Sequence, residues 1–169
     1  WNIYAGFSKQ INKAISLEAS VAAEQYHSPI WDKWRVYPTL NALWNVNDNH
    51  LLNLSFSSNS EFPSYWSTMS NVFYSSTYSE IHGNPDLKHT VADNFDMRFE
   101  TYPHPSEQIM ACAFFKRIKD PIEYGMVSGF GQDTYYMPGN YGTAYNYGIE
   151  LDFMKYFNRF GVKANYTYT

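Results

Sequence analysis

Two aromatic-rich segments, residues 58–89 and 119–143, hold the side chains best suited to binding a ligand. Aromatic faces stack on sugar rings and flat chelates, and loops carried by a rigid scaffold commonly form binding sites. We expect some of these aromatic residues to form a ligand-gripping rim. Packing between the loops, or a place at lipid headgroups, is the alternative. The candidate ligand-binding residues are Tyr65, Trp66, Tyr74, Tyr78, Tyr124, Tyr135, Tyr136 and Tyr141.

The residues that could hold a metal or catalyse a reaction are scattered. His82, His89 and Asp86 share one segment, but no spacing orients a nucleophile or ties a histidine to a carboxylate. A metal site needs a converging set of ligands. We therefore predict no enzyme, no metal site and no cofactor. The five histidines, read as solvated, are His27, His50, His82, His89 and His104.

Composition excludes several other classes of function. The 169 residues are 20% aromatic and 17% charged, with a net charge of −4 and no run of Lys or Arg. Nucleic-acid binding usually requires a basic patch, so we expect no nucleic-acid partner. Cys112 is the single cysteine, and no intrachain disulfide can form. The longest apolar run, residues 109–115, is far shorter than the ~20 residues of a membrane helix.

Apolar and polar residues alternate with a period of two along most of the chain, which predicts half-buried β-strands. We expect an all-β fold, an antiparallel up-and-down meander of about eight strands. Its connections alternate in length. The short ones lie near residues 9–13, 47–50, 103–107 and 157–160, and the longer ones near residues 27–33, 58–89 and 119–143.

These loops and faces indicate part of a transmembrane β-barrel. Such barrels have short periplasmic turns, long outer loops, an apolar face on lipid and a polar face on the lumen. Charged strand residues such as Glu18, Arg35 and Glu150 fall on the polar face. Both ends of the sequence lie within strand-like alternation. We therefore expect an excerpt of a wider barrel rather than a closed eight-stranded one.

Four motifs, taken in order, resemble those of TonB-dependent outer-membrane receptors. The segment from Gly83 to Lys88 (GNPDLK), followed by Asp93-Asn-Phe-Asp96, is similar to the family's NP-x-L-K-P-E … N-x-E signature, although His89 replaces its proline. Each motif alone is weak, and together they span most of the chain. The other three are Tyr37-Pro-Thr-Leu-Asn41, Tyr147-Gly-Ile-Glu-Leu151 and Ala164-Asn-Tyr-Thr-Tyr168.

The resemblance implies a barrel of roughly 22 strands with an N-terminal plug, in the cell outer membrane of a Gram-negative bacterium. It implies energised uptake of a scarce ligand: an iron chelate, a corrinoid, a glycan or a peptide. Implied partners are outer-membrane lipid and the TonB complex reached through the plug, and a surface lipoprotein is a further candidate. We expect residues 1–169 to be one segment of the receptor barrel, with no plug domain.

Two other functions stay open from the sequence. The first is a soluble, aromatic-rich β-sandwich that binds carbohydrate. The second is a small eight-stranded barrel with an adhesion or enzymatic role. A membrane barrel needs detergent, whereas a sandwich does not, and an upstream plug would distinguish a receptor from a small barrel.

Overall fold

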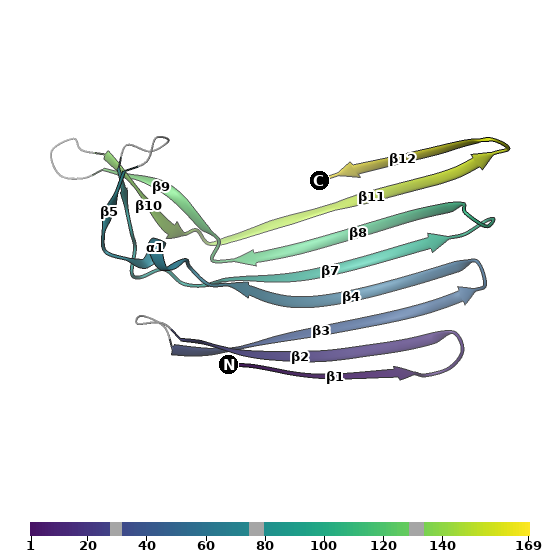
Figure 1. Cartoon of the computed structure of the whole chain (residues 1–169), viewed down its shortest axis with the longest axis horizontal. Helices are drawn as coiled ribbons and strands as arrows, with labels where there is room; N and C mark the ends of the chain where they lie inside the picture. The colour runs from purple at the N-terminus through teal and green to yellow at the C-terminus, as the bar shows by residue number, and fades with distance from the viewer. Residues whose placement is uncertain (28–31, 75–79, 129–133) are drawn as a thin grey trace. The chain divides into compact units, whose positions relative to one another are not determined.

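A computed structural model describes residues 1–27, 32–74, 80–128 and 134–169, with the side chains of Tyr26 and Asp32 left aside. The chain divides into two compact units (Figure 1). The sheet unit comprises Trp1–Asn59, Asp93–Arg117 and Tyr145–Thr169. The loop unit comprises Ser60–Ala92 and Ile118–Ala144.

The sheet unit is built on one eight-stranded antiparallel meander, which confirms the predicted fold class. Strands adjacent in the sheet follow one another in the chain, apart from the places where the loop unit is inserted. The strand order is β1-β2-β3-β4-β7-β8-β11-β12, and the sheet is not closed into a barrel within this chain. The strands are β1 (Asn2–Gln10), β2 (Ile15–His27), β3 (Asp32–Asn47), β4 (His50–Glu61), β7 (Thr90–Thr101), β8 (Gln108–Lys119), β11 (Thr143–Phe157) and β12 (Phe160–Tyr168).

Asparagine residues shape three of the tight turns, two of them through side-chain hydrogen bonds. The side-chain oxygen of Asn12 accepts hydrogen bonds from the backbone N–H groups of Ala14 and Ile15, both at 2.8 Å. The corresponding oxygen of Asn47 accepts from the N–H of Asn49 at 2.9 Å. Asn158 has a φ of 55°, a left-handed conformation that asparagine tolerates better than most residues. These contacts explain why the turns form where asparagine clusters predict them.

The register of the sheet separates apolar from polar side chains. Residues directly opposite one another in paired strands share a face, so Phe7, Ala19 and Leu40 form one apolar row with Phe56. Glu18 and Asn41 form the neighbouring polar row with Ser55. The large apolar side chains remain exposed, with Leu40 at 53% and Leu17 at 41%. This face is therefore not covered by a second protein layer, as a β-sandwich would require.

The loop unit contains more regular structure than the two long loops predicted from sequence. It holds a short helix, α1 (Tyr65–Thr68), and a four-stranded sheet in the order β5-β6-β10-β9. Strand β6 is parallel to β10, and the other pairs are antiparallel. The strands are β5 (Val72–Phe73), β6 (Ile81–His82), β9 (Ile122–Ser128) and β10 (Thr134–Asn140).

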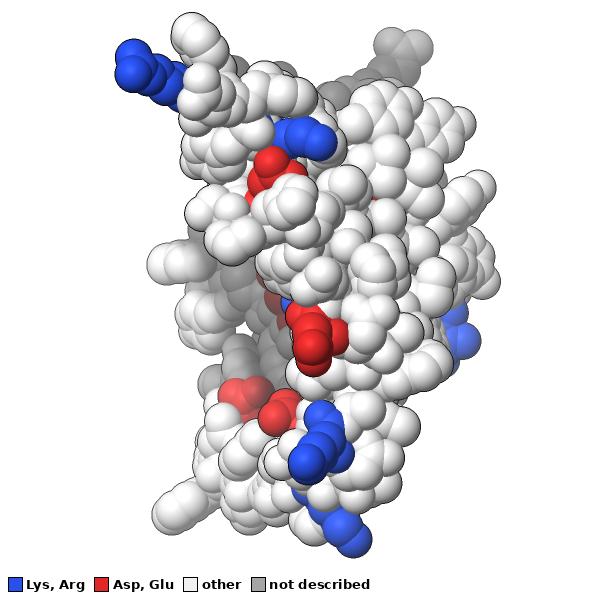
Figure 2. Space-filling view, turned by 90° about the vertical axis from the view of Figure 1, so that its right-hand side faces the viewer, with Lys and Arg blue, Asp and Glu red and all other residues white. Residues whose placement is uncertain are grey.

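Charged side chains are sparse on the face of the molecule shown in Figure 2. Most of that surface is uncharged, and the acidic side chains gather mainly along a hollow. No helix among the described residues is long and apolar enough to cross a membrane.

Candidate functional site

The structure brings most of the predicted ligand-binding residues together in the loop unit. Tyr65 and Trp66 lie on α1, Tyr74 follows β5, and Tyr124 lies on β9. Two more lie on β10 and one directly after it: Tyr135, Tyr136 and Tyr141. Tyr78 lies outside the described residues. Whether these residues bind a ligand stays a prediction.

A small cavity of about 150 Å³ opens among these elements. The aromatic rings of Trp66, Phe73 and Tyr124 line it. The rings of Trp66 and Phe73 meet edge to face, with centroids 5.9 Å apart and an angle of 84° between their planes. Ile81, His82 and Pro138 complete most of the wall. Among the described residues, no Lys, Arg, Asp or Glu side chain lines the cavity.

His82, in the wall of this cavity, pairs with the carboxylate of Glu80. Its Nε2 atom lies 2.5 Å from Oε1 of Glu80, and its ring stacks on Tyr135 with centroids 4.0 Å apart. The side chains of His82 and Glu80 are 33% and 38% exposed, so solvent still reaches this pair. From the sequence, His82 was expected to be a solvated loop histidine. Glu80 precedes the two-residue strand β6, so no strand alternation in the sequence predicts this pair.

The other groups considered for catalysis have different partners. The ring of His89 lies against Phe62, with centroids 5.7 Å apart. The backbone N–H of Asp86 donates to the side-chain oxygen of Asn84 at 2.9 Å. In the described ranges, no group of three or more His, Cys, Asp or Glu side chains is placed to hold a metal ion.

The GNPDLK segment positions the cavity wall. The N–H of Gly83 donates to the carbonyl of Asn71 at 3.1 Å, and the N–H of Asn84 donates to the carbonyl of Ser67 at 2.7 Å. The side-chain amide of Asn84 also donates to the carbonyl of Pro138 at 2.9 Å. These bonds hold the segment against the chain around α1 and against β10. Leu87, from the same segment, is fully buried.

A second set of bonds joins the end of the segment to β10. The side-chain oxygen of Asn140 accepts from the N–H of Lys88 at 2.7 Å. Its amide nitrogen donates to the carbonyls of Lys88 and Asp120, at 3.0 and 2.8 Å. One asparagine therefore connects three parts of the loop unit through backbone groups. We call these bonds the Asn140 clasp.

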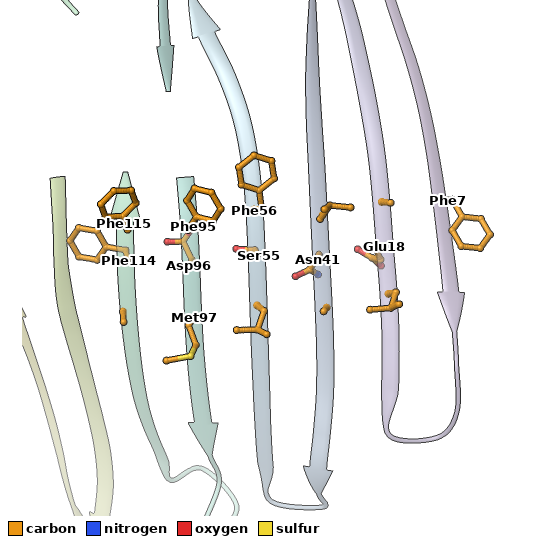
Figure 3. Close-up of a pocket in the computed structure, with 16 residues that line it drawn as sticks. Phe7, Glu18, Asn41, Ser55, Phe56, Phe95, Asp96, Met97, Phe114 and Phe115 are labelled. Atoms are coloured by element: carbon orange, nitrogen blue, oxygen red, sulfur yellow. The ribbon is translucent and has the colours of Figure 1, made fainter. Parts of the chain in front are cut away.

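In the sheet unit, a hollow of about 730 Å³ is lined mainly by aromatic and aliphatic residues, with a few polar ones among them. Figure 3 shows Phe56, Phe95 and Phe115 at one level of three neighbouring strands. The centroids of the Phe56 and Phe95 rings lie 4.7 Å apart, and those of Phe95 and Phe115 lie 6.3 Å apart. Aromatic side chains thus continue the apolar row across these strands.

Near one end of β4, β7 and β8, a charged network joins the side chains of three neighbouring strands. Its members lie two residues along their strands from Phe56, Phe95 and Phe115, and therefore on the same side of the sheet as those rings. Arg117 on β8 contacts Asp93 on β7 through its Nη2 atom at 2.5 Å. The other oxygen of Asp93 accepts from the hydroxyl of Ser58 on β4 at 2.8 Å. These bonds connect neighbouring strands through side chains as well as backbone groups.

A meander with one exposed apolar face, one polar face and long connections between tight turns has the architecture of an outer-membrane β-barrel wall. Over residues 1–169 the sequence matches the family described as TonB dependent receptor-like, beta-barrel. The chain belongs to this family of outer-membrane transport receptors. The resemblance drawn from the four motifs is confirmed.

Solved receptor structures share the fold at low sequence identity. The siderophore receptor PirA from Pseudomonas aeruginosa is 14% identical, with a TM-score of 0.84. A mutant ferric enterobactin receptor from the same organism, in complex with enterobactin, is 18% identical, with a TM-score of 0.80. The hemophore receptor HasR of Serratia marcescens, in complex with its hemophore HasA and heme, is 12% identical, with a TM-score of 0.77.

The chain is much shorter than these receptors. The alignments cover 98–99% of this chain but only 33% of PirA, 26% of the enterobactin receptor and 33% of HasR. Among curated proteins, no sequence matches this chain.

Proposed function

We propose that the chain is a segment of the wall and outer loops of a receptor for TonB-dependent uptake of a scarce ligand. The sheet unit would lie in the outer membrane of a Gram-negative bacterium, and the plug that reaches TonB would come from elsewhere in the receptor. The observation that carries this proposal is the exposed apolar face of the sheet. Exposing so many large apolar side chains to water is unfavourable, whereas contact with lipid satisfies them.

The loop unit supplies the ligand contacts in this proposal. It is inserted between β4 and β7 and between β8 and β11, the connections that alternate with the tight turns. In outer-membrane barrels the long connections face outward, where a ligand arrives. The exposed aromatic side chains of Trp66 and Tyr124 would grip it. Known receptors of the same fold are named for siderophores, enterobactin and a heme-carrying hemophore.

Cell fractionation and genetics test this proposal. The full-length protein should fractionate with the outer membrane and resist extraction without detergent. A strain lacking its gene should fail to grow on at least one scarce nutrient that a strain lacking TonB also cannot use. Recovery of the protein in the soluble fraction would refute the proposal. So would normal growth of the gene-deletion strain on every nutrient that requires TonB.

A further inference from the structure

We propose that the cavity of the loop unit binds one ring of a neutral carbohydrate, so that the imported ligand is a glycan rather than an anionic iron chelate. This inference rests on the proposed function and specifies its ligand. Three observations carry it: the charge of the loop unit, the lining of the cavity, and the volume of the cavity.

The charge of the chain is unequally divided between the two units. Of its 12 Lys and Arg and its 16 Asp and Glu, residues 60–92 and 118–144 hold two and six. The loop unit therefore carries the whole net charge of −4, and the sheet unit is neutral with ten of each sign. A negative field lowers the local concentration of an anionic ligand and slows its arrival.

The loop unit also lacks the usual groups for binding an anion. It contains no arginine, the side chain that best binds carboxylate and phosphate through paired hydrogen bonds. Its two cations are Lys88 and Lys119, and neither lines the cavity. An anionic chelate would lose its hydrating water on entering a site that offers its charge no partner, and this desolvation costs free energy. A neutral ligand avoids this cost.

The cavity lining suits the two kinds of surface on a sugar ring. The carbon–hydrogen face of a pyranose is apolar and packs on the flat face of an aromatic ring. Trp66 and Tyr124 offer such faces, since their side chains are 65% and 46% exposed. The hydroxyl groups at the ring edge need hydrogen-bond partners. The His82 imidazole lies in the wall, and the Glu80 carboxylate that pairs with it lies next to it.

The volume limits how much of a ligand enters. At about 150 Å³ the cavity is well below the 300–1,000 Å³ or so of a site that encloses a drug-sized molecule. It has room for one ring but not for a macrocycle. We infer that a terminal or branching sugar inserts, while the rest of the glycan lies across the exposed aromatic surface beside α1.

A cationic ligand is the closest competitor, because aromatic rings and a negative field also attract cations. The lining argues against it, since no Asp or Glu side chain among the described residues lines the cavity. The two classes of ligand differ in how binding responds to salt. Binding of a cation to a negative unit weakens as ionic strength rises, whereas binding of a neutral sugar does not.

The test applies the full-length receptor, in detergent, to an array of neutral mono- and oligosaccharides of glucose, galactose, mannose, xylose and N-acetylglucosamine. Sugars that bind are then measured by calorimetry at about 0.05 M and about 0.5 M NaCl. A ferric catecholate chelate and a lysine-rich peptide serve as anionic and cationic probes. We expect binding to a neutral glycan, with a Kd that changes less than about twofold between the two salt concentrations.

Trp66→Ala should weaken glycan binding roughly tenfold or more, the loss expected when an aromatic anchor is truncated. Met126→Ala is the matched control, because Met126 is equally exposed, at 66%, lies in the same unit and does not line the cavity. It should bind as the unmodified receptor does. Both side chains are exposed, so both variants should fold, and resistance to thermal unfolding checks this.

Four results would overturn the inference. They are binding of the ferric chelate without any neutral glycan, binding of the cationic peptide alone, strong salt dependence of glycan binding, and unchanged affinity in folded Trp66→Ala. In the first two cases the protein still fractionates with the outer membrane and still binds a solute, so the receptor proposal survives. Recovery in the soluble fraction would instead defeat the receptor proposal itself.

Discussion

At the scale of single residues, Gly83 is a position that accepts no side chain. A Cβ atom added there would lie 1.8 Å from the carbonyl oxygen of Met69, a backbone atom that cannot rotate away. We predict that Gly83→Ala destabilises the loop unit by about 1–3 kcal/mol, because the segment must move off α1. Hydrogen exchange at the N–H of Asn84, which donates to the carbonyl of Ser67, measures this opening.

Gly139 provides the control for that substitution. A Cβ atom at Gly139 would meet the side chain of Tyr141 at 3.4 Å, an ordinary contact with a group that can rotate. Gly139→Ala should therefore leave exchange at Asn84 close to that of the unmodified chain. Equal exchange rates in the two variants would show that the approach of Gly83 to Met69 does not constrain the segment.

Tyr102, in the turn after β7, has a side chain coupled to a buried carboxylate. Its hydroxyl donates a hydrogen bond to Glu100, which is only 7% exposed and also contacts Arg98. The bond to Glu100 raises the pKa of Tyr102 above its ordinary value of 10.0, and burial raises this pKa further. Because ionisation is easier in the unfolded chain, the contribution of this phenol to stability is full below pH 10.0. It is lost as the pH rises through the raised pKa.

We predict that Tyr102→Phe removes one late-titrating phenol from the alkaline absorbance titration of the folded protein. The difference between the titrations of the unmodified protein and the variant isolates this group from the other tyrosines. Its midpoint should lie above pH 10.0. A midpoint at or below that value would mean that the hydrogen bond to Glu100 does not form in solution.

At the scale of elements, the Asn140 clasp holds the loop unit together through side-chain bonds to backbone groups. Asn140→Ala removes one accepted and two donated hydrogen bonds, and we predict a loss of about 1–3 kcal/mol in local stability. Asn140→Asp should be at least as damaging. A carboxylate can still accept from the N–H of Lys88, but it donates nothing to the carbonyls of Lys88 and Asp120 and repels them.

Hydrogen exchange of residues 84–88 in the three proteins measures the effect of the clasp. We expect the slowest exchange in the unmodified chain and the fastest in Asn140→Asp. If Asn140→Asp protected the segment as well as asparagine does, the donated hydrogen bonds would carry no energy, and the clasp would reduce to the contact with Lys88.

The strands of the two units show how much of the fold the sequence predicts. Period-two alternation along β2 and β3 predicts which residues lie on the same side of the sheet, because each strand is long enough to repeat the pattern several times. The strands β5 and β6 have two residues each, and such a length holds no period to detect. Their positions depend on contacts distant in sequence, such as the bond from Asn84 to Pro138, 54 residues away.

The cavity was predictable only in part for a similar reason. The aromatic content of the two segments predicts Trp66 and Tyr124 as candidates, but not that Phe73 would meet Trp66 edge to face. His82 and Glu80 are two residues apart, but β6 comprises only Ile81 and His82, so no alternation in the sequence predicts that their side chains meet. Local patterns therefore identify the residue types of the site, and tertiary contacts decide which residues converge.

At the scale of the whole molecule, the same substitution should have different effects on stability on the two faces of the sheet. Leu40 and Thr39 are adjacent on β3, and their side chains point to the apolar and the polar face respectively. Both are exposed in the isolated chain. In a water-soluble protein, arginine at either position would have little effect, since surface substitutions usually change stability by less than about 0.5 kcal/mol.

In a membrane barrel the two substitutions differ sharply. Leu40→Arg places a charge against lipid, at a cost of about 2–4 kcal/mol near the middle of the bilayer. Thr39→Arg places the same charge on the face that we assign to the lumen, where water solvates it. We predict that the full-length receptor carrying Leu40→Arg is less stable to urea in lipid bilayers, by about that amount, than the receptor carrying Thr39→Arg. Equal stability of the two variants would mean that lipid does not cover the face bearing Leu40, because a charge buried in hydrocarbon lowers stability.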